Sequence, residues 1–102
     1  MKKTILITGA SSGIGRETAK YFQSKGWNVI ATMRNPETES ELNQLEGVMV
    51  AKLDVLDLDS IQKAVTTGIQ KFGGIDVLLN NAGYGAYGPL ESFSRDRILR
   101  QF

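Results

Sequence analysis

The sequence predicts an α/β fold in which helices cover both faces of a parallel sheet. Short apolar runs alternate with longer segments whose apolar residues recur at helical spacing. The short runs are nearly continuous rather than alternating, which is typical of strands that are buried on both faces. Strands that alternate with helices favour parallel pairing through right-handed crossovers. With 102 residues, the whole chain (1–102) is expected to form a single domain.

Four apolar runs are predicted to be strands, each bounded by glycine, proline, asparagine or aspartate. They are residues 4–8, 28–33, 48–53 and 76–80. Between them we expect three crossover helices, at residues 13–25, 37–45 and from a cap at Asp59 or Ser60 to Phe72. A loop over 83–89 and a final helix over 94–102 complete the prediction.

The first of these helices is expected to bury Ile14, Thr18, Tyr21 and Phe22, which share one face at helical spacing. Gly26 is expected to end this helix, and Gly73 with Gly74 the third one. Both predictions follow from the preference of helices to stop at glycine.

Composition excludes several classes of function. Twelve basic and 11 acidic residues give a net charge of +1, so there is no electrostatic argument for nucleic acid or an anionic membrane as a partner. The absence of cysteine excludes thiolate metal sites, and the absence of histidine excludes a Ser-His-Asp triad; no metal site is expected. No apolar run is long enough for a signal peptide or a membrane span, so we expect a cytoplasmic protein.

A glycine-rich turn lies between the first predicted strand and the first predicted helix. Residues 8–15 read Thr-Gly-Ala-Ser-Ser-Gly-Ile-Gly. Glycines allow a tight turn and a close approach of backbone to a pyrophosphate, and a helix N-terminus offers free N–H groups with a partial positive charge. The position of the turn favours a phosphate site, although a turn with no ligand is the alternative.

Three segments together resemble the short-chain dehydrogenase/reductase family. The glycine-rich turn resembles the cofactor motif of that family, and residues 80–83, Asn-Asn-Ala-Gly, resemble its second motif. Residues 53–55, Leu-Asp-Val, resemble its adenine-contacting segment. The resemblance spans the whole chain and implies a Rossmann-type, doubly wound sheet with its four strands in the order 3-2-1-4.

The resemblance also implies roles for individual residues. The pyrophosphate would lie along the glycine-rich turn, the adenine beside the Asp54 loop, and the nicotinamide ribose beside the second motif. For Asp54 the alternative is a turn or helix cap, and for Asn80 and Asn81 it is a structural tie between the first and fourth strands. The expected cofactor-binding residues are Gly9, Ser11, Ser12, Gly13, Ile14, Gly15, Arg34, Asp54, Val55, Asn81, Ala82 and Gly83.

Cofactor preference depends on the end of the second predicted strand. Dinucleotide-binding folds of this type that prefer NAD carry an acidic residue there, which binds the ribose 2′-hydroxyl. This sequence has Met33 followed by Arg34, which suits a 2′-phosphate. We therefore expect NADP(H) to be preferred over NAD(H). A solvated arginine in the turn before Pro36 is the alternative.

The family resemblance implies an oxidoreductase that moves hydride between nicotinamide and a carbonyl or alcohol substrate. Its catalytic Ser and Tyr-x-x-x-Lys would lie downstream of the fourth strand, so no catalytic residue is assigned. Tyr21 and Lys25 have the catalytic spacing, but they are predicted at the far end of the first helix, about 12 Å beyond Gly13. Tyr84 and Tyr87 are expected at most to form the wall of a substrate pocket.

The chain is therefore expected to be the cofactor-binding part of a longer enzyme and to be inactive alone. The alternatives are a stand-alone nucleotide-binding module and a half-domain made to study folding. The fourth strand, with Val77, Leu78 and Leu79, is expected to have an unpaired edge, which favours self-association.

Overall fold

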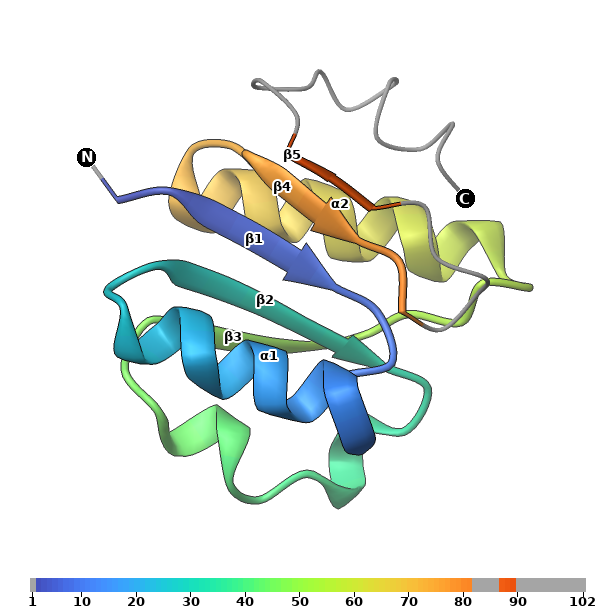
Figure 1. Ribbon diagram of the computed structural model, residues 1–102. Helices are drawn as coiled ribbons and strands as arrows, with labels where there is room; N and C mark the ends of the chain where they lie inside the picture. Colours follow the sequence, from blue (N-terminus) through green and yellow to red (C-terminus); the bar gives the residue numbers. More distant parts are fainter. Residues whose placement is uncertain (1, 82–86, 90–102) are drawn as a thin grey trace.

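Five strands form one sheet in the order β3-β2-β1-β4-β5. The computed structural model describes residues 2–81 and 87–89. The parallel strands are β1 (Thr4–Ile7), β2 (Asn28–Met33), β3 (Val48–Lys52) and β4 (Val77–Leu79). The predicted order 3-2-1-4 is confirmed, and Figure 1 shows these strands pointing the same way.

The fifth strand, β5 (Tyr87–Pro89), is antiparallel to β4 and was not predicted. Its backbone pairs Gly88 with Leu78 and Tyr87 with Leu79. The expectation of an unpaired β4 edge is therefore wrong, and with it the reason given for self-association. Glycine and proline in this segment favour a loop in a sequence reading, but proline is tolerated in an edge strand.

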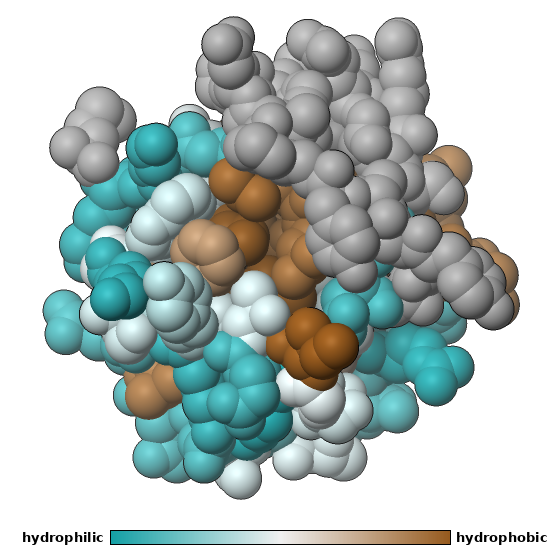
Figure 2. Space-filling view, viewed as in Figure 1, coloured by the Kyte–Doolittle hydropathy of each residue, from teal (hydrophilic) through white to brown (hydrophobic). Residues whose placement is uncertain are grey.

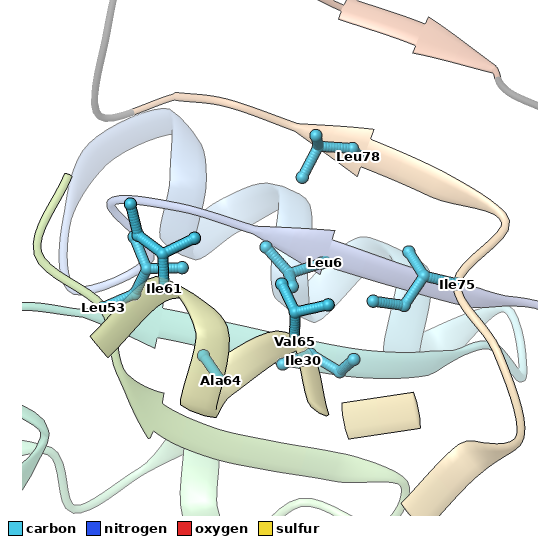
Figure 3. Close-up of a cluster of buried hydrophobic side chains, with 8 residues drawn as sticks. All are labelled: Leu6, Ile30, Leu53, Ile61, Ala64, Val65, Ile75 and Leu78. Carbon is cyan, nitrogen blue, oxygen red and sulfur yellow. The ribbon is translucent and has the colours of Figure 1, made fainter. Parts of the chain in front are cut away.

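Two helices cover opposite faces of the sheet (Figure 1). Helix α1 (Gly13–Ser24) lies on one face and α2 (Leu58–Phe72) on the other. Alternate residues of each strand therefore enter two separate cores. The core under α2, drawn in Figure 3, comprises Leu6, Ile30, Leu53, Ile61, Ala64, Val65, Ile75 and Leu78. The core under α1 comprises Ile5, Ile7, Ala10, Ala19, Val29, Ala31, Met33 and Leu42.

Helix α1 packs on the sheet through small residues, and of the large residues predicted for its core face only Phe22 contacts the core. Gly15 and Ala19 are its buried residues, whereas Ile14 is 75% and Tyr21 58% exposed. The small side chains let the helix axis approach the strands closely; Ile14 and Tyr21 point outward, whereas Phe22 is half-buried against the core under α1. Viewed from the α1 side, the molecule shows hydrophobic surface near its centre (Figure 2). The prediction that Ile14 and Tyr21 face the core is wrong.

Helix α2 begins slightly earlier than predicted. The Asp57 side chain accepts hydrogen bonds from the backbone N–H groups of Asp59 and Ser60, so Asp57 is the cap. Gly73, with φ of 90°, ends the helix in the left-handed conformation, as predicted for this glycine. Farther along the helix, a Cβ on Gly68 would collide with the Ile30 side chain, so glycine sets how closely α2 approaches β2.

The segment between β2 and β3 is not the helix predicted over 37–45. It forms two short 3₁₀ turns, η1 (Pro36–Thr38) and η2 (Leu42–Gln44). The Glu39 carboxylate accepts hydrogen bonds from the backbone N–H groups of Glu41 and Leu42, which interrupts any continuous helix between the two turns. Only Leu42 of this segment is buried in the core under α1.

The helix predicted over 94–102 lies outside the described residues. Among the helices that are described, none combines the length and apolar character needed to cross a bilayer.

Candidate cofactor-binding site

A cleft of about 520 Å³ lies at the carboxyl ends of the parallel strands. Parallel strands direct the turns that follow them to one edge of the sheet, and ligands of open α/β sheets bind there. The residues that line the cleft come from four such turns: Gly9, Ser11, Ser12, Met33, Arg34, Asn35, Thr38, Leu53, Asp54, Val55, Leu56 and Asn81. Most of the residues predicted from the sequence thus meet in one cleft.

The remaining predicted residues lie elsewhere or outside the described part. Gly13 and Ile14 border a shallow hollow on the outer side of α1, together with Glu17 and Tyr21, and not the cleft itself. Gly15 is buried beneath the turn. Ala82 and Gly83 lie outside the described residues.

The glycine-rich turn is held by backbone conformation and by close packing. Gly9 and Gly13 have φ of 64° and 60°, in the left-handed region that favours glycine. Gly15 packs directly against the turn, because a Cβ there would collide with the Gly9 carbonyl oxygen and lie 2.8 Å from Asn81 Nδ2. The start of α1 is thereby held against the end of β1.

The N-terminus of α1 is open to an anion. Within residues 2–81, the Ser12 side chain makes no capping hydrogen bond, and the first turn of α1 contains no acidic residue. The first N–H groups of a helix have no partner within the helix and carry a partial positive charge. Because Ser11 and Ser12 line the cleft, this charge lies at its wall.

Polar contacts join the ends of β1 and β4 beneath the cleft. The Thr8 backbone N–H donates to the Leu79 carbonyl at 3.0 Å, and the Thr8 hydroxyl donates to Asn80 Oδ1 at 3.0 Å. Asn81 Nδ2 donates to the Gly9 carbonyl at 3.4 Å. Asn80 therefore forms the tie between the ends of β1 and β4 that was its alternative role, whereas Asn81 both supports the turn and lines the cleft.

Asp54 has one carboxylate oxygen occupied and the other available. Oδ1 accepts the Leu56 N–H at 2.9 Å, which is the turn cap considered as its alternative role. The Asp54 backbone N–H donates to the Ser60 hydroxyl at 2.9 Å, and that hydroxyl is tied to the Asp57 carbonyl at 2.8 Å. Oδ2 has no hydrogen-bond partner in the described part of the chain, so it can accept a hydrogen bond from a ligand.

The two arginines near the cleft differ in their partners. Arg16 donates to Glu39 at 2.7 Å and to Glu41 at 2.9 Å. The Arg16 guanidinium and the backbone N–H groups of residues 41 and 42 lower the pKa of Glu39 to about 2. Arg34 is exposed and has no carboxylate partner among the described residues. The positive charge of Arg34 is therefore available to an anion in the cleft.

Sequence reasoning missed Asn35, Thr38 and Leu56, which also line the cleft. The Asn35-Pro36 pair marked a turn, and the turn brings Thr38 back to the edge of the sheet: the Thr38 hydroxyl donates to the Asn35 carbonyl at 2.9 Å. Leu56 is 92% exposed, and only its place directly after the Asp54 loop could have indicated it.

Tyr21 and Lys25, which have the catalytic spacing in the sequence, lie away from the cleft. Tyr21 is exposed on the outer side of α1, and Lys25 Nζ lies 5.6 Å from the centroid of its ring. Neither residue lines the cleft. The pair thus lies away from the cleft, as expected, but the Tyr21 ring is exposed to solvent and not buried in the core.

Comparison with known proteins gives consistent matches. The family model described as short chain dehydrogenase matches residues 3–102. An uncharacterized oxidoreductase, C162.03, of Schizosaccharomyces pombe is 40% identical over 98 residues, which are 96% of this chain and 33% of that protein. The chain spans about a third of the length of the curated relatives it matches.

Two solved structures resemble the chain over most of its length. One is a variant of actinorhodin polyketide ketoreductase with NADPH, with a TM-score of 0.73 and 32% identity, covering 80% of this chain and 33% of that one. The other is 3-ketoacyl-(acyl-carrier-protein) reductase from Brucella melitensis complexed with NADH, with a TM-score of 0.69 and 31% identity, covering 74% of this chain and 32% of that one.

Proposed function

Because the chain belongs to the short-chain dehydrogenase family, we propose that it is the NADP(H)-binding part of an oxidoreductase that moves hydride between nicotinamide and a carbonyl or alcohol carbon. The observation that carries the proposal is the convergence of the glycine-rich turn, the Asp54 loop and Asn81 on one cleft. Family members with solved structures have been crystallised with NADPH and with NADH, which supports a nicotinamide dinucleotide as the ligand.

The residues of the cleft fit such a ligand chemically. The open N-terminus of α1 and the backbone of the glycine-rich turn would hold the pyrophosphate, because both present N–H donors without acidic neighbours. The free carboxylate oxygen of Asp54 would accept a hydrogen bond from the adenine amino group, with Val55 beside it. Asn81, and by family resemblance Ala82 and Gly83, would border the nicotinamide ribose. The bound nicotinamide would supply or accept the hydride.

The preference for NADP(H) follows from charge at the end of β2. A 2′-phosphate in the cleft would meet Arg34, whose guanidinium has no partner among the described residues. Met33, which is 2% exposed, stands where an acidic residue would bind the ribose hydroxyls of NAD. Asn35 and Thr38 add polar groups on the same side of the cleft.

Removing the Arg34 charge tests this preference. Arg34→Ala is expected to raise the Kd of NADPH roughly 10- to 100-fold, as for the loss of a charge-assisted hydrogen bond. The Kd of NADH should change by less than about twofold, because NADH has no 2′-phosphate. Titration calorimetry with both nucleotides measures the two constants.

Lys63→Ala is the matched control, because it removes the same charge from the exposed surface of α2, outside the cleft. It is expected to change neither constant. If unaltered protein binds NADH as tightly as NADPH, the proposed preference is wrong. If it binds neither nucleotide, the proposed cofactor role is wrong as well.

The chain by itself is proposed to bind cofactor without turnover. Its only Tyr-x-x-x-Lys spacing is that of Tyr21 and Lys25, neither of which lines the cleft. The alternative, a stand-alone binding module, makes the same prediction for this chain. The enzyme hypothesis and this alternative differ for a protein that extends beyond residue 102: carbonyl-dependent oxidation of NADPH by such a protein supports the enzyme hypothesis. Substrate-dependent oxidation by this chain alone would contradict the assignment of no catalytic residue.

A further inference from the structure

The Arg16 side chain contacts two walls of the cleft from behind. Its guanidinium donates to the Ser11 carbonyl in the glycine-rich turn at 3.4 Å and to Glu39 at 2.7 and 3.3 Å. Ser11 belongs to the wall assigned to the pyrophosphate, and Glu39 directly follows Thr38 in the wall that carries Arg34. Arg16 itself does not line the cleft.

Glu39 is fixed more firmly than a surface carboxylate. Its side chain is only 4% exposed, against 53% for Glu41. Besides two bonds from Arg16, its carboxylate accepts the N–H groups of Glu41 and Leu42, both at 2.8 Å. Leu42 is fully buried under α1, so the carboxylate connects the core to the wall. A bidentate arginine–carboxylate pair with low exposure holds a defined geometry.

The short segment from Arg34 to Glu39 connects the anchored Glu39 carboxylate to the wall of the cleft. The Thr38 hydroxyl and the Thr38 N–H both donate to the Asn35 carbonyl, at 2.9 and 3.2 Å. The Glu39 N–H donates to the Pro36 carbonyl at 3.0 Å. The residues between Asn35 and Glu39 thus form one compact turn, and the position of Glu39 sets the position of the side chains at its other end.

We propose that Arg16 and Glu39 are positioning residues for cofactor choice: their ion pair holds the Arg34–Thr38 wall at a fixed distance from the glycine-rich turn. The inference rests on the proposed cofactor role and deepens it. Without the ion pair, the residues of both walls are still present, but no side chain holds the two walls at a fixed distance from each other. The 2′-phosphate, which must contact the Arg34 wall while the pyrophosphate occupies the glycine-rich turn, is then bound less well.

Nucleotides with and without the 2′-phosphate test the inference. Arg16→Ala is expected to raise the Kd of NADPH about tenfold and that of NADH by less than about threefold, so that the ratio of the NADH Kd to the NADPH Kd falls. Titration of 2′,5′-ADP and 5′-AMP should give the same pattern, because these fragments report on the adenosine end alone. Circular dichroism and the thermal midpoint of each variant report whether the fold is kept.

Two further variants make the test independent of one side chain. Glu39→Gln keeps an oxygen for the backbone N–H groups and removes the charge, so it should reduce the NADPH to NADH preference while leaving the chain folded. Lys20→Ala is the control: among the described residues Lys20, which lies on the same helix, pairs only with the exposed Glu41, at 2.6 Å. It should leave both constants unchanged within about twofold.

The possible outcomes separate the two proposals. If the unaltered chain binds NADPH and the Kd ratio stays the same in folded Arg16→Ala and Glu39→Gln variants, the inference about the pair is wrong while the cofactor role stands. Equal weakening of NADPH and NADH also contradicts it, because that result indicates general loosening of the fold. If the unaltered chain binds neither nucleotide, both proposals fail together.

Discussion

At the scale of single residues, Gly15 leaves no room for a methyl group. Its Cα faces the Gly9 carbonyl oxygen and the Asn81 amide, which themselves form a hydrogen bond. Any side chain there must push the glycine-rich turn away from α1. The contact is between a helix backbone and a turn backbone, so no side-chain rotation can relieve it.

Gly15→Ala is therefore expected to lower the free energy of unfolding by about 1–3 kcal/mol, as for overpacking of a well-packed site. NADPH affinity should fall as well, because the turn is displaced. Urea denaturation and nucleotide titration measure the two effects.

Gly74→Ala is the control for that substitution. A methyl group on Gly74 would meet no atom within 4 Å, and Gly74 is not among the described glycines with positive φ. The free energy of unfolding of this variant should change by less than about 0.5 kcal/mol. A Gly15→Ala protein that is as stable as this control would contradict the close packing of α1 on the turn.

At the scale of elements, the sequence predicted the strands better than the segments between them. The four parallel strands are continuous apolar runs, and their predicted bounds differ from the observed ones by at most one residue at each end, whereas β5 was not predicted. Residues 37–45 are polar, and their conformation depends on contacts of Glu39 with Arg16, 23 positions earlier in the chain. Local propensity carries no information on such a partner.

The orientation of α1 shows a second limit of pattern reading. Ile14 and Tyr21 have larger side chains than Gly15 and Ala19, so periodicity places them on the core face although they are exposed. The close approach of the helix to the sheet favours the small residues, and that approach is a property of the tertiary structure. Seven of the twelve residues predicted for the site line one cleft, because they follow strands whose carboxyl ends share one edge of the sheet.

The segment between β2 and β3 should also make the fold sensitive to acid. The pKa of Glu39 is about 2 in the folded chain against an ordinary value of 4.5, because Arg16 and the backbone N–H groups stabilise the carboxylate. The unfolded chain therefore takes up the proton first. The stabilisation by Glu39 is complete above about pH 4.5 and is lost as the pH falls toward about 2.

Urea midpoints measured between about pH 6 and about pH 3 check this expectation against Glu39→Gln. The variant should be less stable at the higher pH, and its midpoint should fall less on acidification. The pKa of Glu41 is also lowered, by Lys20 and then by Arg16, and this acts in both proteins. The difference between the two profiles therefore isolates Glu39. Parallel profiles would contradict the role of its charge.

At the scale of the whole molecule, the cleft exists only when four separate turns are assembled at one edge of the sheet. A ligand of this cleft binds the folded chain and not the unfolded one, so it must stabilise the fold by mass action. The size of the effect depends on the affinity and on the concentration of free ligand.

NADPH at a hundred times its Kd is expected to raise the free energy of unfolding by about 2.7 kcal/mol. The same concentration of NADH should raise it less, and Arg34→Ala should reduce the effect of NADPH. Thermal or urea denaturation with each nucleotide measures these differences. An unfolding midpoint that does not respond to either nucleotide would contradict binding at the cleft.

The bonds from Thr8 to Asn80 and from Asn81 to Gly9 each join residues 72 positions apart. By contrast, β1 and β2 pair residues only 24 positions apart, such as Thr4 with Asn28. Closing the longer loop costs more chain entropy, which favours early formation of the β1–α1–β2 unit and late arrival of β4. A partly folded chain in which β4 is not yet paired lacks the side of the cleft that Asn81 forms. We therefore expect a nucleotide that binds the complete cleft not to guide folding, but to slow the separation of β4 from β1 afterwards.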